Sequence, residues 1–333
     1  MTAKASSSQS RSHAATPSKT EWTCYLDPMP AMVQGVIPIL HTPYREDGTI
    51  DRESLRREVD WVFATGADGC GIALASDILR MAPQERIDLF GAVVKLVGGR
   101  GPVVASVGAE TAEQAELYAR AARAAGAAAL MAIPPRERAL SEPELERYFE
   151  RIALVTPLPM IVQDASGYVG KPMNAEFQAG LMRSGGADKV WFKPEANPVG
   201  PLISRLRELT EGRARIFEGS GGVSLIENWR RGIAGTMPGC DLLDAVVPLW
   251  KALQAGNEAE AYRLWLPVAA IAILEGTAGL DGYIAIERYI MMKRGIFSSD
   301  RMRGADAWTP DGMMKAEIDR LLAILRTAVG NEG

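Results

Sequence analysis

The stretch Asp188-Lys189-Val190-Trp191-Phe192-Lys193-Pro194-Glu195-Ala196-Asn197-Pro198 decides the fold of this chain. It has the character of a short buried strand that ends on a lysine and is stopped by a proline. Because side chains alternate along a strand, Trp191 and Lys193 share one face while Val190 and Phe192 share the other. Both faces are largely apolar, which is typical of a parallel strand covered on both sides.

Lys193 is the candidate nucleophile of this stretch. Burial favours the neutral form of a lysine, and a neutral amine attacks a ketone to form a Schiff base. The alternative is an ammonium group that reaches solvent past the end of the strand. The chain contains 28 Arg and only 9 Lys, so a plain surface cation at this position would more often have been arginine. This bias favours the catalytic interpretation.

Composition excludes several classes of function. The 333 residues are 47% hydrophobic and 23% charged, which is typical of a globular chain with room for one large α/β domain. The net charge of −4 argues against nucleic acid or an anionic membrane as the partner. Three scattered cysteines and two histidines predict neither a disulfide framework nor a metal site.

No segment is expected to cross a membrane, and residues 1–28 are expected to form a disordered tail. The longest apolar run, from Leu264 to Leu274, is interrupted by Pro267 and is too short for a bilayer. The first twenty residues are rich in Ser, Ala and Thr without an apolar stripe. We therefore expect a cytoplasmic protein.

Apolar segments alternate with helical patterns along most of the chain, and this alternation favours a parallel sheet with right-handed crossovers. The predicted strands cover residues 35–40, 69–73, 102–107, 127–133, 160–163, 190–193, 215–218 and 235–237. Eight such units predict a (β/α)₈ TIM barrel over residues 29–256. A doubly wound sheet is the alternative, but it requires a Gly-rich fingerprint after the first strand, and this chain has none there.

Residues 257–333 are expected to form a C-terminal helical extension without strands. The apolar spacing predicts helices at 258–275, 281–296 and 314–329. These helices could cover the barrel or build an interface between subunits.

In a TIM barrel the chemistry lies at the carboxyl ends of the strands, where Lys193 is accompanied by several carboxylates. Asp164 and Glu195 are the candidate general bases, with Asp77 as a third, because a carboxylate beside an apolar barrel mouth can have a raised pKa. The alternative for each is a helix cap or a structural hydrogen bond. His41 is interpreted as a hydrogen-bonded residue at a strand end.

The chain resembles the dihydrodipicolinate synthase/N-acetylneuraminate lyase family over most of residues 33–330. The motifs that carry the resemblance are Thr42-Pro43, Glu46-Asp47-Gly48, Gly66-Ala67-Asp68-Gly69, Gly108, Lys193 and Gly219. The resemblance implies a Schiff base between Lys193 and pyruvate or another 2-oxo acid, with no cofactor. It also implies a homotetramer or homodimer.

Departures from the family pattern lie around the expected site. The family's Gly-Thr-Thr-Gly-Glu after the second strand is replaced by Ala73-Leu74-Ala75-Ser76-Asp77. Ala75, Ser76, Asp77, Thr42 and Gly219 remain candidates for binding the substrate. Pro135 stands where the family has its proton-relaying tyrosine, and Tyr168 stands where the synthases have an arginine for a second carboxylate. Tyr168 is a candidate replacement for the missing phenol.

The resulting prediction is a Schiff-base lyase, an aldolase or a dehydratase, acting on pyruvate or a 2-oxo (3-deoxy sugar) acid, and not the lysine-pathway synthase. Two alternatives stay open. One is a phosphate-handling barrel isomerase that uses the Gly-rich segment 219–222, and the other is a barrel that only binds a metabolite.

Overall fold

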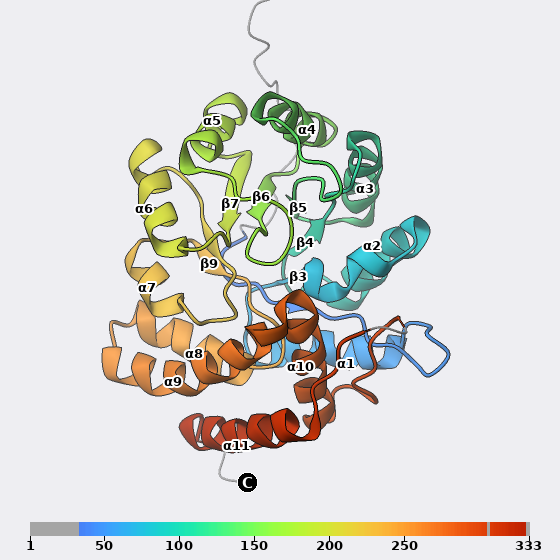
Figure 1. Ribbon diagram of the computed structural model, residues 1–333, viewed down its shortest axis with the longest axis vertical. Coiled ribbons are helices and arrows are strands. Elements are labelled where there is room, and N and C mark those ends of the chain that lie inside the picture. The colour runs from blue at the N-terminus through green and yellow to red at the C-terminus, as the bar shows by residue number, and fades with distance from the viewer. Residues whose placement is uncertain (1–32, 305–306, 331–333) are drawn as a thin grey trace, which may run out of the picture.

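A computed structural model describes residues 33–304 and 307–330 of the chain. The tail predicted at residues 1–28 lies outside this part. Parallel strands form the centre of the fold and helices surround them, as Figure 1 shows in a view along the barrel. The strands are β1 (Gly35–Val36), β2 (Ile39–Leu40), β3 (Cys70–Ile72), β4 (Val103–Ser106), β5 (Ala129–Ala132), β6 (Met160–Asp164), β7 (Val190–Pro194), β8 (Phe217–Glu218) and β9 (Gly235–Thr236).

The strands close into a barrel through two sets of neighbours, β2-β3-β4-β5-β6-β7 and β1-β9-β8. A parallel bridge between Phe192 and Ile216 joins β7 to the segment that precedes β8. The other junction is the single segment that carries β1 and β2. It is divided at Ile37 and Pro38, because proline has no N–H for the ladder. The predicted TIM barrel is confirmed, and its first strand is interrupted at this point.

Eight helices follow the barrel strands in the described chain and pack around them. They are α1 (Arg52–Ala64), α2 (Pro83–Val97), α3 (Ala112–Ala125), α4 (Glu142–Leu154), α5 (Ala175–Gly185), α6 (Val199–Leu209), α7 (Leu225–Arg230) and α8 (Leu243–Gln254). Local sequence sets their ends. The Thr111 side chain accepts a hydrogen bond from the Gln114 N–H at the start of α3, and Gly126, with φ of 95°, ends it.

Alternation along β7 places its side chains as the sequence predicted. Trp191 belongs to the cluster inside the barrel, where its ring lies 6.2 Å from that of Phe217. Val190 and Phe192 belong to the larger cluster between the strands and the outer helices. Lys193 therefore points toward the barrel axis, at the carboxyl end of the strand.

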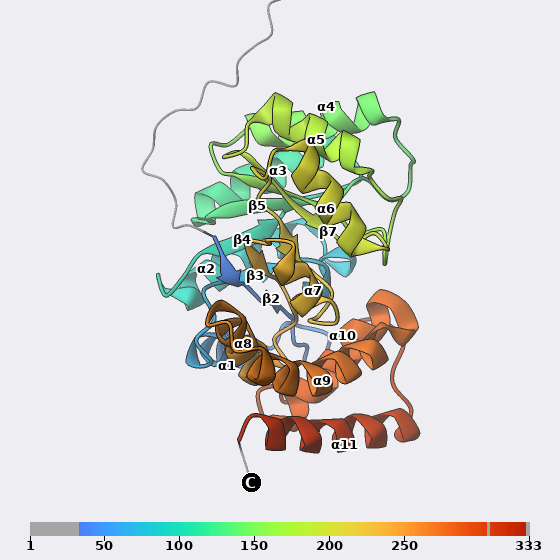
Figure 2. The ribbon, with the colours of Figure 1, turned by 90° about the vertical axis from the view of Figure 1, so that its left-hand side faces the viewer.

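Three further helices form the C-terminal extension, α9 (Glu258–Glu275), α10 (Gly279–Lys293) and α11 (Gly312–Ala328). Short 3₁₀ helices occur at Leu74–Ser76, Ile78–Arg80 and Gly276–Ala278. The helix α9 packs on α8 and α11, while α10 contacts the 3₁₀ turn Leu74–Ser76 at the barrel mouth. Figure 2 shows α11 lying along the outer side of α9.

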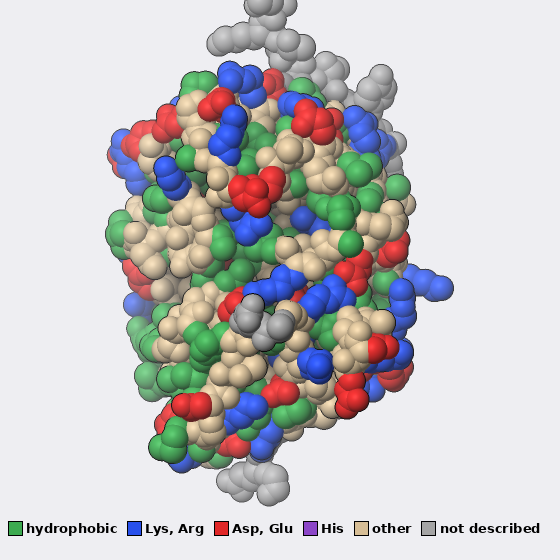
Figure 3. All heavy atoms as spheres, turned by 45° about the vertical axis from the view of Figure 1, so that its right-hand side comes forward, with side chains coloured by type: hydrophobic (Ala, Val, Ile, Leu, Met, Phe, Trp, Pro, Cys, Tyr) green, Lys and Arg blue, Asp and Glu red, His purple; other side chains and the backbone are tan. Residues whose placement is uncertain are grey.

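By length and composition alone, the stretch Glu258–Lys293 is apolar enough to cross a membrane, with a mean hydropathy of 1.4. It consists of α9 and α10 separated by a 3₁₀ turn, and both helices pack against other parts of the fold. Apolar core helices satisfy the same criterion, so this stretch is no argument for a membrane span. On the face shown in Figure 3, basic and acidic side chains are interspersed with apolar and polar ones.

Candidate active site

The site is centred on a buried ion pair at the end of β7. Lys193 and Glu195 are two residues apart, so both side chains emerge on the same face. The Lys193 Nζ lies 2.8 Å from Glu195 Oε1, and the two residues are 4% and 7% exposed. On the neighbouring strand β6, the Gln163 amide donates to Glu195 Oε2 at 2.6 Å. The carboxylate is therefore held between the amine and an amide.

The contact places the Glu195 carboxylate where it can accept a proton from Lys193 Nζ. Burial raises the pKa of Glu195, although the Lys193 ammonium and the Gln163 amide oppose this shift. A carboxylate with a raised pKa is a better proton acceptor for a neighbouring ammonium. Transfer of one proton from Nζ to Oε1 leaves a neutral amine, which is the nucleophilic form of lysine.

Gly219, which follows β8, provides the space for the pair. A Cβ at this position would lie 2.6 Å from Lys193 Nζ and 2.7 Å from Glu195 Oε1. The small pocket in front of the amine has a volume of about 60 Å³. Its lining includes the following residues: Ala73, Leu74, Ala75, Gln163, Tyr168, Lys193, Glu195, Gly219, Gly239, Tyr283 and Glu287.

Tyr168 and Tyr283 stand between this pocket and a larger neighbouring cavity. Their rings pack edge to face with centroids 5.4 Å apart, and their hydroxyl groups are hydrogen-bonded. Burial raises the pKa of Tyr168, and the nearby Glu195 carboxylate raises it further. Tyr168 is thus a protonated phenol at the pocket wall, contributed by the loop after β6, while Tyr283 comes from α10.

Among the predicted substrate-binding residues, Ala75 and Gly219 line the pocket and the other three lie behind it. The Thr42 hydroxyl donates to the Ser76 carbonyl at 2.7 Å, and Ser76 Oγ accepts from the Ala73 N–H at 3.1 Å and donates to the Leu40 carbonyl. Asp77 accepts from Tyr44 and Arg80. These polar groups hold the loop after β3, so the arrangement does not support direct substrate binding by Thr42, Ser76 or Asp77.

Asp164 makes structural hydrogen bonds, which is the alternative to a general base that its sequence position left open. Its Oδ1 accepts the Ser166 N–H at 3.1 Å, and its Oδ2 accepts the Met173 N–H at 2.8 Å. It does not line the pocket in front of the amine. Both carboxylate oxygens are therefore used to hold the loop after β6, and the geometry favours Glu195 over Asp164 as a proton acceptor.

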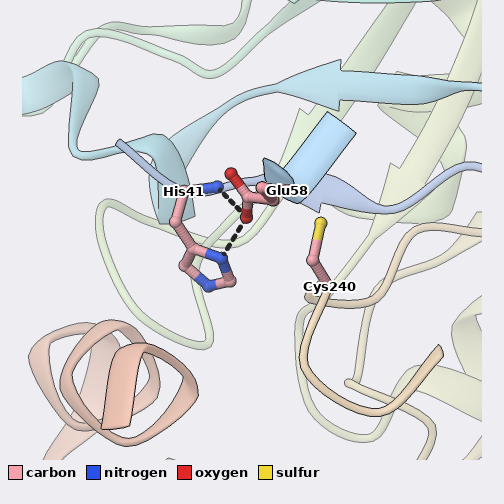
Figure 4. Close-up of side chains that lie close together, drawn as sticks. All are labelled: His41, Glu58 and Cys240. Atoms are coloured by element: carbon pink, nitrogen blue, oxygen red, sulfur yellow. Dashed lines mark hydrogen bonds and ion pairs between the residues drawn. The ribbon is translucent and has the colours of Figure 1, made fainter. Parts of the chain in front are cut away.

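A second buried charge network lies beside the pocket. His41, directly after β2, places Nδ1 2.8 Å from Glu58 Oε1 and Nε2 2.7 Å from Glu287 Oε2. Figure 4 shows the imidazole turned toward Glu58, whose carboxylate also accepts the His41 N–H at 2.9 Å. Burial opposes a charge on the ring, but the hydrogen bonds to Glu287 and Glu58 outweigh it and raise the pKa of His41 to about 10. The ring is an imidazolium at neutral pH.

The cluster of His41, Glu58 and Cys240 also has the residue types of a metal site, with donor atoms within 4.8 Å of one another. Its chemistry does not fit one. Burial raises the pKa of the Cys240 thiol well above its ordinary value. The thiol lies 3.3 Å from the Ile39 carbonyl as a donor, and the imidazole nitrogens are paired with carboxylates. We interpret the cluster as a charged hydrogen-bond network.

Sequence reasoning missed Tyr283 and Glu287, because the helices after the barrel were interpreted as a cover or an interface. The sequence signal that could have identified Glu287 is the spacing of the apolar residues around it. Glu287 lies between Ile284 and Ile290 at helical spacing, so the charged residue shares the buried face of α10. A carboxylate on such a face requires a partner, and His41 provides it.

Comparison with known proteins was made by sequence first. Residues 32–186 match the Dihydrodipicolinate synthetase family. The L-2-keto-3-deoxyarabonate dehydratase of Azospirillum brasilense is 27% identical over 282 residues, which cover 81% of this chain and 87% of the dehydratase. A 4-hydroxy-tetrahydrodipicolinate synthase of Neisseria meningitidis serogroup C (strain 053442) is 32% identical over 182 residues, which cover 54% of this chain and 62% of the synthase. The match to this synthase thus spans about three fifths of its length.

Solved structures share the fold. The prophage protein YagE of E. coli K12, a member of the dihydrodipicolinic acid synthase family solved with pyruvate, superposes with a TM-score of 0.80 at 20% identity. The superposed region covers 89% of this chain and 99% of YagE. The dihydrodipicolinate synthase of Rhodopseudomonas palustris gives a TM-score of 0.78 at 24% identity, over 91% of this chain and all of that one. At these identities the likeness establishes the fold.

The raised pKa of His41 predicts a pH-dependent contribution to stability. Between its ordinary value of 6.5 and about 10, the folded state holds a proton that the unfolded state releases, so stability falls as pH rises. We expect the advantage of the wild type over His41→Gln in urea unfolding to be largest below pH 6.5 and to shrink toward pH 10. An advantage that stays constant over this range would contradict an imidazolium at position 41.

Gly219→Ala is predicted to displace Lys193 or Glu195, because the added methyl group would overlap both. Borohydride trapping of pyruvate on the protein should fall by about 10²-fold, as expected for an amine misplaced by about 1 Å. Gly91→Ala is the matched control. A Cβ on Gly91, inside α2, meets nothing within 4 Å, so this variant should trap normally and melt no lower than the wild type. Normal trapping by Gly219→Ala would show that the pair is not confined by this glycine.

Proposed function

We infer that this chain, a divergent member of the dihydrodipicolinate synthetase family, is a Schiff-base-forming lyase that acts on pyruvate or a related 2-oxo acid. The observation that carries the proposal is the contact of 2.8 Å between Lys193 Nζ and Glu195 Oε1, buried at the carboxyl end of a barrel strand. The pair opens onto a pocket, and barrel enzymes carry their chemistry at this end.

The pair performs the first covalent step with its own groups. Glu195 Oε1 takes a proton from Nζ, and the neutral amine attacks the C2 carbonyl carbon of the 2-oxo acid. A proton moves from nitrogen to the former carbonyl oxygen to give the carbinolamine. Glu195 then returns its proton to this hydroxyl group, which leaves as water while the nitrogen lone pair forms the C=N bond. The product is an iminium ion whose positive charge faces the Glu195 carboxylate.

The surroundings of the pair favour a substrate with a neutral, hydroxylated tail. The cavity behind Tyr168 and Tyr283 has a volume of about 350 Å³, and its polar lining includes Asn197, Ser220, Ser224 and Thr277. Among the residues that the structure describes, no Arg or Lys lines this cavity, and Lys193 is the one Lys or Arg that lines the inner pocket. A 3-deoxy-2-oxo sugar acid would fit the two cavities together, with its 2-oxo acid end at Lys193 in the inner pocket and its hydroxyl groups in the outer cavity.

Dehydration is the reaction that we place first, with aldol cleavage as the other lyase reaction open to the same iminium. The relative that is matched over most of its length is named as a keto-deoxy sugar acid dehydratase. In our proposal Ala75 and Gly219 contact the 2-oxo acid end and Tyr168 contacts the tail. The chemistry needs no cofactor. We further propose a cytoplasmic enzyme that assembles as a homotetramer or homodimer.

Lys193→Arg is predicted to abolish covalent trapping, because a guanidinium stays protonated and is not a nucleophile. In the wild type, borohydride with pyruvate should add the reduced adduct to the peptide that contains Lys193, detected by mass spectrometry. Lys251→Arg, an exposed lysine in α8, is the control and should trap as the wild type does. Folded wild-type protein that forms no adduct with any short 2-oxo acid would refute the proposed function.

The protein is predicted not to be the lysine-pathway synthase. The aldehyde partner of that reaction carries its own carboxylate, and Tyr168 offers it a neutral hydroxyl in place of a charged bidentate arginine. The exchange costs about 1–2 kcal/mol, or about tenfold to thirtyfold in binding. Pyruvate with aspartate semialdehyde should therefore give little turnover in a coupled assay. Turnover near 10 per second, which is typical of a working enzyme, would contradict this prediction.

A further inference from the structure

Glu287 is the carboxylate of the pocket wall that the first covalent step leaves unused. It lines the pocket together with Lys193 and comes from α10, in the C-terminal extension. It is 4% exposed, and its Oε2 is bound to the His41 imidazole at 2.7 Å. In the described part of the chain its Oε1 has no hydrogen-bond partner, and it lies over Gly239, which also lines the pocket.

Three other carboxylates at the carboxyl ends of the strands, Glu195, Asp164 and Glu218, have both oxygens engaged. Asp241 Oδ2 and Glu275 Oε1 lack a partner in the described part of the chain, but neither residue lines the pocket. Glu195 is bound to Lys193 and Gln163, while Asp164 holds the amides of Ser166 and Met173. Glu218 accepts from Ser220 and from the Thr236 hydroxyl, the latter at 2.6 Å. An iminium ion at Lys193 keeps Glu195 beside its nitrogen as the counter-ion. A second base for the carbon chain must therefore come from elsewhere in the pocket, and Glu287 has a free oxygen.

The position of Glu287 is maintained by its surroundings. A Cβ on Gly239 would lie 2.7 Å from Glu287 Cδ and 2.8 Å from Asp241 Oδ1. Any larger residue at position 239 would therefore displace the Glu287 carboxylate. On the other side, His41 is held in turn by Glu58 through Nδ1. The other titratable groups that interact with Glu287 are Cys240, Asp241, Glu275 and Tyr283. The hydrogen bonds between Glu58 and His41 and between His41 and Glu287 thus hold Glu287 Oε2 in place. Glu287 Oε1 stays available on the side of the pocket.

We propose that Glu287 is the catalytic base that removes the proton from C3 of the iminium ion. The proposal rests on the proposed function, because it needs the Schiff base at Lys193. The C3–H electron pair forms the C2=C3 double bond, the C=N π electrons return to nitrogen, and Glu287 becomes a carboxylic acid. In a dehydration, the enamine then expels the C4 hydroxyl group, which takes the proton from Glu287 and leaves as water. The carboxylate is restored for the next turnover.

This step can be isolated with pyruvate alone. Pyruvate bound as an iminium ion exchanges its methyl protons with D₂O through the enamine, and ¹H NMR follows the loss of the methyl signal. We expect Glu287→Gln to slow this exchange by about 10²–10⁴-fold, the range for loss of a general base. Borohydride trapping at Lys193 should stay at the wild-type level, since Glu195 supports that step.

Asp281→Asn is the matched control. It removes a carboxylate from the same helix that is paired with Arg80 and does not line the pocket. Its exchange rate should stay within about twofold of the wild type, because it alters none of the groups that form the adduct. Should Glu287→Gln not fold, Glu287→Asp keeps the charge and withdraws the carboxylate by one methylene, and we expect about 10–10²-fold slower exchange.

The outcomes separate this proposal from the proposed function. Absence of a wild-type adduct refutes the Schiff-base enzyme itself. An adduct with wild-type exchange in the Glu287 variants overturns the role of Glu287 and leaves the enzyme assignment intact. An adduct in the wild type without any methyl exchange also overturns it. A normal adduct with slowed exchange in the folded Glu287 variants and normal exchange in Asp281→Asn supports it.

Discussion

The buried ion pair between Lys193 and Glu195 is the interaction on which the site depends. Removing two charges from water costs several kcal/mol for each, and the cost is recovered only when geometry and further hydrogen bonds are favourable. Here strand alternation sets the two side chains on one face, Gln163 satisfies the second carboxylate oxygen, and Gly219 leaves the space. The same burial that makes the pair costly also raises the pKa of Glu195, which makes this carboxylate a better proton acceptor.

The second network, Glu58–His41–Glu287, links three parts of the fold that are distant in sequence. Glu58 comes from α1, His41 from the end of the first barrel strand, and Glu287 from α10. Loss of one member would leave an uncompensated buried charge, so the network connects the C-terminal extension to the barrel energetically. The extension is therefore part of the pocket wall, where Tyr283 and Glu287 both lie, and not only a cover for the outer helices.

Lys193 matches the strand-end lysine of the family that the chain resembles, while the groups around it depart from the pattern of that family. The loop 73–77 is held together by hydrogen bonds of Ser76 to Leu40 and of Asp77 to Tyr44 and Arg80. Pro135 lies in a different cavity, away from Lys193. Among the described residues, the lining of the outer cavity includes hydroxyl and amide groups and the Glu195 carboxylate, but no Arg or Lys. Under the proposed function, these differences concern the groups that transfer protons and the groups that contact the tail of the substrate.

The sequence by itself determined the barrel and the strand-end lysine, because these depend on local patterns. Alternation in 190–193 set Trp191 and Phe192 on opposite faces, and in the structure Trp191 lies inside the barrel and Phe192 outside it. The roles around the lysine depended on contacts between distant segments, and only the tertiary structure decided them. It engaged Asp164 with backbone amides, placed Ser76 behind the pocket, and brought Glu287 within 2.7 Å of His41 across 246 residues. Hydrophobic spacing specifies which face of a helix is buried, but it does not specify which buried polar groups will meet.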